Sequence, residues 1–315
     1  MGINFTRVTK NPLQDKDALV FNISGESRYT ILAINPGSTS TKIAIYNGSE
    51  AKVELTLRHS TEELSHFASP IDQSEWRKSL ILNTLAENNI DIESLSAVIG
   101  RGGLLHPIES GVYEVNQTMI DELRSCTPQH ASNLGAIIAS EIAELCQAKA
   151  YIADPIVVDE LDEVTKITGI KQIRRRSIFH ALNQKAMARR YASDIGRPYE
   201  ELNLIVAHLG GGISIGAHHY GRVIDCNNAL DGEGPIAPER AGTIPAGELI
   251  DLCYSGQYTH KQARELIVGG GGWVALAGTN SAIDIVNRAN EGDKSAKEAL
   301  DAMCYGVAKH IGQMA

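Results

Sequence analysis

The sequence lacks the features that mark secreted, membrane-spanning and nucleic-acid-binding proteins. Its five cysteines are widely spaced and never form a CxxC pair, so neither a disulfide scaffold nor a zinc site is indicated. No apolar run approaches the ~20 residues that a membrane helix needs. A net charge of −9 disfavours nucleic-acid binding, and the only basic run, Arg174 to Arg176, indicates a helix flank or a local anion contact. We therefore expect no nucleic-acid or membrane partner, and a location in the reducing cytoplasm.

One segment occurs twice. TILAINPGSTSTKIAIYNGSE begins at residue 30 and LIVAHLGGGISIGAHHYGRV at residue 204, and each reads as strand, small-residue turn, strand and glycine turn. Equivalent positions lie 173 residues apart: Asn35 and His208, Gly37 and Gly210, Gly48 and Gly221. Two such hairpins facing a cleft suit a polyphosphate, because glycine lets backbone N–H groups approach its oxygens and hydroxyls donate to them. The alternative is a pair of ordinary hairpins.

The length of 315 residues allows two hydrophobic cores of common size. Apolar periodicity predicts strands at 30–34, 97–100 and 151–153, with helices at 76–88, from about 128, and at 179–191. A second group of three strands spans 202–227, and helices follow at 248–254 and from 294 to the end. Alternating strands and helices predict an α/β fold. We expect an N-terminal extension over 1–28, an N-terminal domain over 29–178 and a C-terminal domain over 179–315.

Six motifs carry a resemblance to a known family. They are NPGSTSTK (35–42), GRGG (100–103), DPIVVDEL (154–161), SIFHALNQK (177–185), AHLGGGIS (207–214) and DGEGPIAPERAG (231–242). In this order they resemble the butyrate kinases, part of the acetokinase family within the superfamily of acetate and sugar kinases, Hsp70 and actin. The resemblance implies two domains with a duplicated ribonuclease H-like βββαβα core and a nucleotide cleft between them. It also implies the reaction ATP + butanoate = ADP + butanoyl phosphate.

The resemblance assigns four catalytic residues: Asn35, Arg101, His208 and Arg240. Transfer of a phosphoryl group to a carboxylate brings anions together, so catalysis depends on positioning and charge neutralisation. The planar, bidentate guanidinium groups of Arg101 and Arg240 suit both anions, and both residues lie among glycines or prolines. His208 is expected to donate to the phosphoryl group in flight. No GxSxG or cysteine nucleophile motif is present, and direct attack by the carboxylate needs none.

The expected ATP contacts are glycines, hydroxyl residues, one lysine and one asparagine in three segments. Those for the phosphates are Gly37, Ser38, Thr39, Ser40, Lys42, Gly210, Gly211 and Gly212. Those for the ribose or base are Gly278, Thr279 and Asn280, after the GGGGW run. The alternatives are a hydroxyl-rich turn for the first segment and a flexible glycine loop for the last.

The second implied cofactor is Mg²⁺, and here the sequence departs from the wider pattern. Acetate kinases have an aspartate in the segment FDTAFH, whereas this chain reads RRSIFH with Arg176 at that position. Asp154, before Pro155, is the candidate metal ligand, with a capping or turn role as the equal alternative. Asp159 and Glu160 are weaker candidates.

Family members continue beyond the helix that here ends in IGQMA, so the sequence resembles a C-terminally truncated butyrate kinase with an incomplete nucleotide domain. Exposed sheet would then reduce stability or favour self-association. The resemblance also implies a homodimer or higher homo-oligomer. Two other functions stay open: a kinase for branched short-chain acids such as isobutanoate, and an inactive scaffold of the same fold.

Overall fold

The computed structural model describes residues 5–8, 29–127 and 129–315. The chain forms two compact units, Met1–Val157 and Val158–Ala315. The expected domain boundary after residue 178 lies later than this division. Val158 and Leu161 are buried in one hydrophobic cluster with Phe179, Val223 and Cys226, so the segment before Phe179 belongs with the second unit. No helix in the described part of the chain is long and apolar enough to span a membrane.

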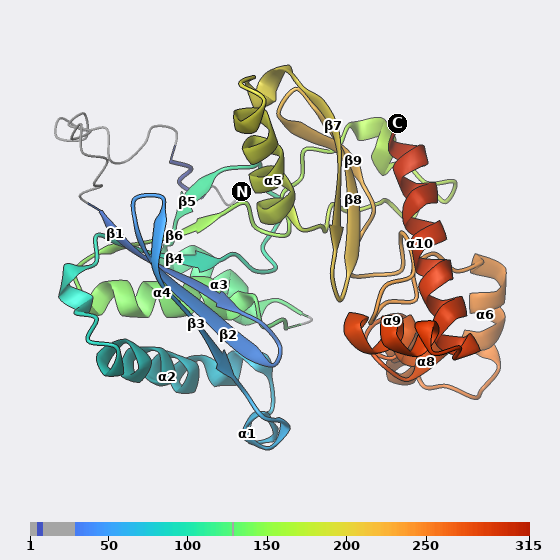
Figure 1. Ribbon diagram of the computed structural model, residues 1–315, viewed down its shortest axis with the longest axis horizontal. Coiled ribbons are helices and arrows are strands. Elements are labelled where there is room, and N and C mark those ends of the chain that lie inside the picture. The colour runs from blue at the N-terminus through green and yellow to red at the C-terminus, as the bar shows by residue number, and fades with distance from the viewer. Residues whose placement is uncertain (1–4, 9–28, 128) are drawn as a thin grey trace. The chain divides into compact units, whose positions relative to one another are not determined.

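The first unit is a six-stranded sheet with helices (Figure 1). Its strands are β1 (Thr30–Pro36), β2 (Ser40–Asn47), β3 (Glu50–Arg58), β4 (Ala97–Arg101), β5 (Val112–Glu114) and β6 (Lys149–Ala153), in the order β3-β2-β1-β4-β6-β5. β1, β4 and β6 are parallel, and the other pairs are antiparallel. Its helices are α1 (Thr61–Ser65), α2 (Ser74–Glu87), α3 (Gln117–Ser125) and α4 (Asn133–Leu145). Parallel strands end at one edge of a sheet, which places the residues after β1, β4 and β6 close together.

Of the expected N-terminal extension, residues 1–4 and 9–28 lie outside the described residues. The described part is not a loose tail, because Arg7 pairs with Tyr113 of β5 in an antiparallel bridge.

Helix α4 packs most closely on this sheet. Leu134, Ile138 and Ile142 are fully buried against β1 and β4, as their helical spacing predicts. Leu145, the last residue of the helix, is 56% exposed. The helix begins at Asn133, later than the expected start near residue 128, because residues 129–132 form a turn first.

The second unit contains a three-stranded antiparallel sheet and six helices among its residues. The strands are β7 (Asn203–Leu209), β8 (Ile213–His219) and β9 (Arg222–Cys226). The helices are α5 (Ala181–Asp194), α6 (Ala246–Tyr254), α7 (His260–Ile267), α8 (Trp273–Ala277), α9 (Ala282–Asn290) and α10 (Lys294–Met314). The three predicted strands are confirmed, and so are the helices predicted at 179–191, at 248–254 and from 294, as α5, α6 and α10. Helices α7, α8 and α9 were not predicted.

The duplication is visible in the strand pairing. In the first hairpin Asn35 of β1 pairs with Lys42 of β2, and in the second His208 of β7 pairs with Ser214 of β8. Each middle strand also carries one irregularity in its next pairing, after Ile45 in β2 and after Ala217 in β8. The offset is therefore 173 residues in the first strand and 172 in the second, because the second hairpin turn is one residue shorter.

Candidate functional site

The turn between β1 and β2 is held from below by a buried arginine. The Arg77 guanidinium, on α2 and 0% exposed, donates to the carbonyl oxygens of Gly37 (2.9 Å), Ser38 (3.3 Å) and Ser40 (3.3 Å). In a trans peptide the C=O of one residue and the N–H of the next point in opposite directions. The N–H groups of Ser38 and Thr39 are therefore directed away from Arg77.

This geometry would suit an anion at the turn. The side chains of Ser38 and Thr39 are exposed, and their hydroxyls lie on the same short turn as the outward N–H groups. Arg77 makes no ion pair with a carboxylate among the described residues, so its positive charge stays uncompensated beneath the turn. Burial lowers its pKa to about 10, which still leaves the guanidinium charged at neutral pH. Sequence reasoning missed Arg77, since nothing around it marks it as more than one helical arginine.

Asn35, Lys42 and Arg101 lie on three neighbouring strands at one end of the first sheet. Asn35 pairs with Lys42 across β1 and β2, and the Arg101 Nη1 donates to the Asn35 Oδ1 at 3.4 Å. Arg101 is half-buried, and burial lowers its pKa. The structure thus brings together three of the predicted site residues around one patch of positive charge and amide.

Close packing of α4 on β4 explains the glycines around Arg101. A methyl group at Gly100 would clash with the carbonyl oxygen of Gly135, and one at Gly135 would clash with the carbonyl oxygen of Arg101. At Gly103 it would overlap the side chain of Asn133, whose Oδ1 accepts from the Leu104 N–H at 2.9 Å. Glycine at these positions lets the helix N-terminus lie directly on the strand end that carries Arg101.

Asp154 follows β6 at the same end of the sheet, but its carboxylate is engaged. The Oδ1 accepts from the Ser110 hydroxyl at 2.6 Å and from the Gly111 N–H at 2.9 Å, and the side chain is 4% exposed. Asp154 also adopts a positive φ of 38°, as turn residues of this type do. The described residues contain no group of three or more His, Cys, Asp or Glu side chains placed to hold a metal ion. These contacts support the turn role of Asp154, and its ligand role stays a prediction.

The glycine turn of the second unit lies beside His208. The His208 Nδ1 accepts from the Asn183 Nδ2 at 2.8 Å. A Cβ added at Gly210 would lie 3.1 Å from the His208 Nε2. The N–H of Glu239 donates to the Gly211 carbonyl at 3.1 Å, which ties the loop before Arg240 to this turn. Three predicted elements, namely His208, the glycine turn and the PERAG loop, therefore meet at one place in the unit.

Arg240 is half-buried in that place, and one of its donors is unused. Its Nη1 donates to the Glu239 carbonyl at 2.8 Å and lies 3.6 Å from the Glu239 Oε2, while its buried Nε has no hydrogen-bond partner among the described residues. Burial lowers the pKa of Arg240, against the opposing effect of the Glu239 carboxylate. Buried donors are rarely left unpaired, so this Nε is available to an acceptor.

Of the three residues predicted to contact the ribose or base, Asn280 contacts the residue next to Arg240, whereas Gly278 and Thr279 make local contacts around the end of α8. The Asn280 Nδ2 donates to the Glu239 Oε1 at 2.7 Å, so Glu239 links Asn280 to Arg240. Gly278 ends α8 with a left-handed φ of 71°, and the Thr279 hydroxyl accepts from the Ser281 N–H. In the GGGGW run, a methyl at Gly272 would clash with the carbonyl oxygen of Ala237. That run therefore packs beneath the Arg240 loop.

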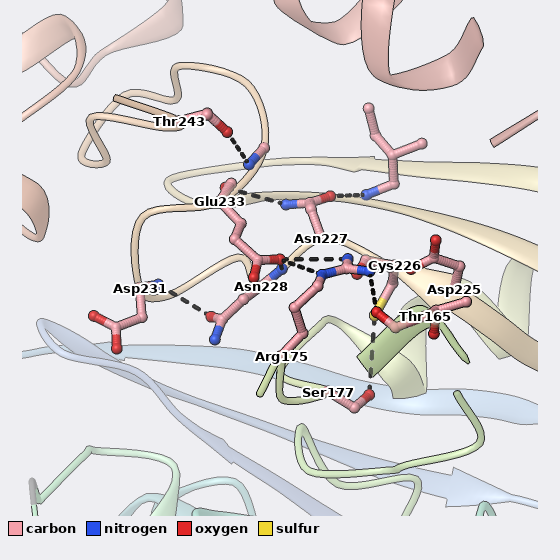
Figure 2. Close-up of polar contacts among 12 residues, drawn as sticks. Thr165, Arg175, Ser177, Asp225, Cys226, Asn227, Asn228, Asp231, Glu233 and Thr243 are labelled. Carbon is pink, nitrogen blue, oxygen red and sulfur yellow. Dashed lines mark hydrogen bonds and ion pairs between the residues drawn. The ribbon is translucent and has the colours of Figure 1, made fainter. Parts of the chain in front are cut away.

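The basic run is neutralised by local carboxylates, as the local-anion interpretation predicts. Figure 2 shows Arg175 between β9 and the loop that leads to Arg240. It donates to the Asp225 carboxylate at 3.0 Å, the Cys226 carbonyl at 2.7 Å and the Glu233 carboxylate at 3.4 Å. Arg176 lies 3.8 Å from the Asp231 carboxylate.

The weaker metal candidates are also paired. Asp159 contacts Lys166 at 3.0 Å, and Glu160 contacts the buried Lys185 at 2.5 Å. Both carboxylates therefore have structural partners.

Comparison with known proteins agrees with this architecture. Residues 161–315 match the model of the acetokinase family. Butyrate kinase 2 of Clostridium acetobutylicum is 52% identical over 289 residues, which cover 91% of this chain and 81% of that protein. Butyrate kinase 1 of the same organism is 54% identical over 286 residues, 90% of this chain and 81% of that protein.

Solved structures show the same fold at low identity. The acetate kinase of Porphyromonas gingivalis superimposes with a TM-score of 0.74 at 19% identity, covering 91% of this chain and 79% of that one. A propionate kinase of Francisella tularensis superimposes with a TM-score of 0.70 at 20% identity, covering 91% of this chain and 80% of that one. The two-unit α/β architecture with its duplicated hairpin is thus the expected fold, and the chain belongs to the acetokinase family.

Proposed function

We propose that this chain transfers the γ-phosphoryl group of ATP to butanoate, giving ADP and butanoyl phosphate. Relatives named butyrate kinases are 50–54% identical over about nine tenths of the chain, which supports butanoate over a branched acid and an active enzyme over an inactive scaffold. A carboxylate oxygen attacks the γ-phosphorus while the bond to the β-phosphate oxygen breaks, and the electron pair leaves with ADP. No covalent bond to the protein forms.

The observation that carries the proposal is the buried Arg240 Nε without a partner among the described residues. Phosphoryl transfer spreads negative charge over the equatorial oxygens, and a guanidinium with an unused N–H is poised to accept that charge. His208 lies at the same glycine turn. Because its Nδ1 accepts from Asn183, its neutral ring carries the proton on Nε2, the atom beside Gly210, and that N–H can donate to a phosphoryl oxygen.

The two units then have different tasks. The first binds the acyl group, with Arg101 and Asn35 at the carboxylate, and offers its turn at Ser38 and Thr39 to phosphate. The second binds the nucleotide, with the glycine turn at the phosphates and Asn280 near the ribose or base. Glu239 supports this arrangement because its two carboxylate oxygens contact Asn280 and Arg240.

We propose that Mg²⁺ binds together with the nucleotide. In kinases Mg²⁺ is commonly bound by substrate phosphates, waters and one or two carboxylates, and there it neutralises charge on the phosphates. No group of three or more His, Cys, Asp or Glu side chains among the described residues is placed to hold it, and the Oδ1 of Asp154, the candidate ligand, already accepts two hydrogen bonds. We therefore derive no step through the metal.

We further infer a homodimer or higher homo-oligomer in a reducing compartment such as the cytoplasm. Helix α6 has no buried residue, and its Ile250 and Tyr254 are 57% and 88% exposed, which supports a covering partner surface. The five cysteines are all free thiols, which supports the compartment. Sedimentation velocity at several protein concentrations tests the oligomeric state, and a monomer at all of them would contradict it.

Acyl hydroxamate formation with ATP, magnesium and one acid at a time tests the function. We expect product with butanoate in excess of that with acetate or isobutanoate. Arg101→Ala and Arg240→Ala should each lower the rate by roughly 10²–10³-fold, as the loss of one charge-stabilising donor does. Arg190→Ala, an exposed arginine paired with Asp194 on α5, is the matched control and should retain full rate. Folded protein that gives no product with any acid would refute the proposal.

A further inference from the structure

His59 is a buried histidine that the proposed phosphoryl transfer does not use. It follows β3 directly and is 5% exposed. Its backbone N–H donates to the Thr39 carbonyl oxygen at 2.9 Å, while Arg77 holds the other carbonyl oxygens of residues 37–40. All four carbonyl oxygens of the turn between β1 and β2 therefore have a donor from outside the turn. Because the N–H of the next residue points the opposite way in a trans peptide, these bonds keep the N–H groups of Ser38 and Thr39 directed outward.

The His59 ring is joined to this arrangement through the hydroxyl of Thr41, which is 0% exposed. The Thr41 Oγ1 accepts from the Arg77 Nη1 at 3.0 Å and lies 2.9 Å from the His59 Nε2. A guanidinium can only donate, so the hydroxyl hydrogen is free for a second partner. The His59 ring is the other partner that this hydroxyl has among the described residues. The hydroxyl therefore donates to Nε2 while its oxygen accepts from Arg77.

The His59 ring is neutral at pH 7, because burial and the nearby Arg77 charge lower its pKa to about 4. With Nε2 as the acceptor, the ring proton is on Nδ1. This Nδ1 is buried and has no hydrogen-bond partner among the described residues, which destabilises the fold. A leucine at position 59 would remove that unpaired donor and leave the Thr41 hydroxyl hydrogen unpaired instead. Stability alone therefore gives no reason for a histidine here.

We propose that His59 is a positioning residue for the turn between β1 and β2. Its ring takes the Thr41 hydrogen and so keeps a lone pair of the Thr41 oxygen directed at Arg77. Arg77, fixed in this way, holds the carbonyl oxygens that turn the N–H groups outward to phosphate. This inference rests on the proposed function, because it assumes that the turn binds the phosphoryl group that is transferred. It extends the binding machinery to a residue on another strand end, outside the NPGSTSTK motif.

Kinetics in both directions of the reaction test the inference. His59→Leu cannot accept the Thr41 hydrogen, and it should raise the KM values for ATP and butanoyl phosphate roughly 3- to 10-fold, the effect of about one lost hydrogen bond. The KM values for ADP and butanoate, which lack the transferred group, should stay unchanged. His59→Gln retains an acceptor and should restore most of the affinity. His66→Leu, which replaces an exposed histidine at the end of α1, is the matched control and should leave all four KM values unchanged.

Stability and binding measurements separate the possible failures. His59→Leu should keep the urea midpoint of the unsubstituted protein nearly unchanged, because one unpaired buried donor replaces another. In an active protein, unchanged KM values for ATP and butanoyl phosphate in His59→Leu, or an equal rise in all four KM values, would overturn the positioning role. If His59→Leu does not fold, Thr41→Val removes the same hydrogen bond, and unchanged KM values in that variant would overturn it.

The inference can also be tested without turnover. If the unsubstituted protein gives no product with any acid, the proposed function is refuted, and titration calorimetry with ATP and with ADP then examines the turn directly. His59→Leu should weaken the binding of ATP roughly 3- to 10-fold relative to that of ADP. The same ratio of the two affinities in His59→Leu and in the unsubstituted protein would overturn the positioning role.

Discussion

Replacement of Arg77 by methionine is the sharpest test of the turn between β1 and β2. Methionine has a similar length but no donor, so the carbonyl oxygens of Gly37, Ser38 and Ser40 would lose their common partner. Arg77 also donates to the Thr41 hydroxyl at 3.0 Å and to the Gln73 Oε1 at 2.7 Å. The substitution therefore removes the contacts that direct the N–H groups of the turn outward.

The expected loss of stability is a difference between two terms. Five acceptors left without this donor destabilise the fold by about 1 kcal/mol each, or about 5 kcal/mol together. In the opposite direction, the buried charge disappears. The lowering of the Arg77 pKa from 12.5 to about 10 corresponds to about 3 kcal/mol of desolvation that methionine does not carry. We expect the free energy of unfolding to fall by about 2 kcal/mol, which leaves a folded protein.

The functional effect should exceed what this loss explains. A turn that no longer presents its N–H groups forfeits about one hydrogen bond to phosphate, ~1.5 kcal/mol, or roughly a tenfold rise in the KM of the phosphoryl substrate. Urea denaturation and kinetics in both directions of the reaction measure the two effects. Arg77→Lys should have a stability and KM values between those of the unsubstituted protein and Arg77→Met, because lysine keeps the charge but not the planar guanidinium group. Unchanged KM values for ATP and butanoyl phosphate in a destabilised Arg77→Met would show that the contacts serve stability alone.

Three further variants or conditions test other contacts. Gly100→Ala should destabilise the first unit by about 1–3 kcal/mol in urea denaturation, because the methyl group meets the carbonyl of Gly135. Asp154→Asn should lower the melting temperature without changing the dependence of rate on magnesium, and a shifted magnesium half-saturation would restore the ligand role. His218, with a pKa of about 4 in the fold and 6.5 in the unfolded chain, should leave stability constant above pH 6.5. Stability should then fall by up to about 3 kcal/mol as the pH drops to 4, because the unfolded state binds the proton first. His218→Gln should reduce this slope in urea midpoints, and His59, whose pKa is also lowered to about 4 by burial, should account for the dependence that remains.

The parts of the fold that the sequence predicts are those with local signals. The strand after Thr30 and the helix before Leu145 carry apolar periodicity, and both hairpins repeat the same turn chemistry at a fixed offset. Helix α3 was missed although Met119, Ile120 and Leu123 have helical spacing, because the segment is only nine residues long. The expected boundary after residue 178 differs from the division after Val157, because the burial of Val158 depends on residues as distant as Val223.

The supporting residues of the site escaped prediction for the same reason. Arg77 lies 40 residues from the Gly37 carbonyl that it binds, and Gln184 lies 30 residues from Ser214. A motif indicates which residues approach a ligand, but not which distant side chains support that motif by hydrogen bonds. Among the supporting residues, Glu239 could be found from the sequence. It lies beside Arg240 in the sequence, and its acidic side chain next to an expected catalytic arginine was a usable signal.

The two hairpins share one backbone arrangement but carry different side chains around their turns. In the first, Asn35 and Lys42 form the exposed pair, and the positive charge beneath the turn comes from Arg77. In the second, the equivalent pair is His208 and Ser214, and Ser214 faces inward to hold His180. Both turns begin with a glycine, Gly37 in the first and Gly210 in the second. Ser38 and Thr39 follow in the first turn, whereas Gly211 and Gly212 follow in the second. A Cβ at Gly212 would lie 2.9 Å from the Ala229 carbonyl oxygen, so a serine at position 212 would add a phosphate donor only if that backbone shifted.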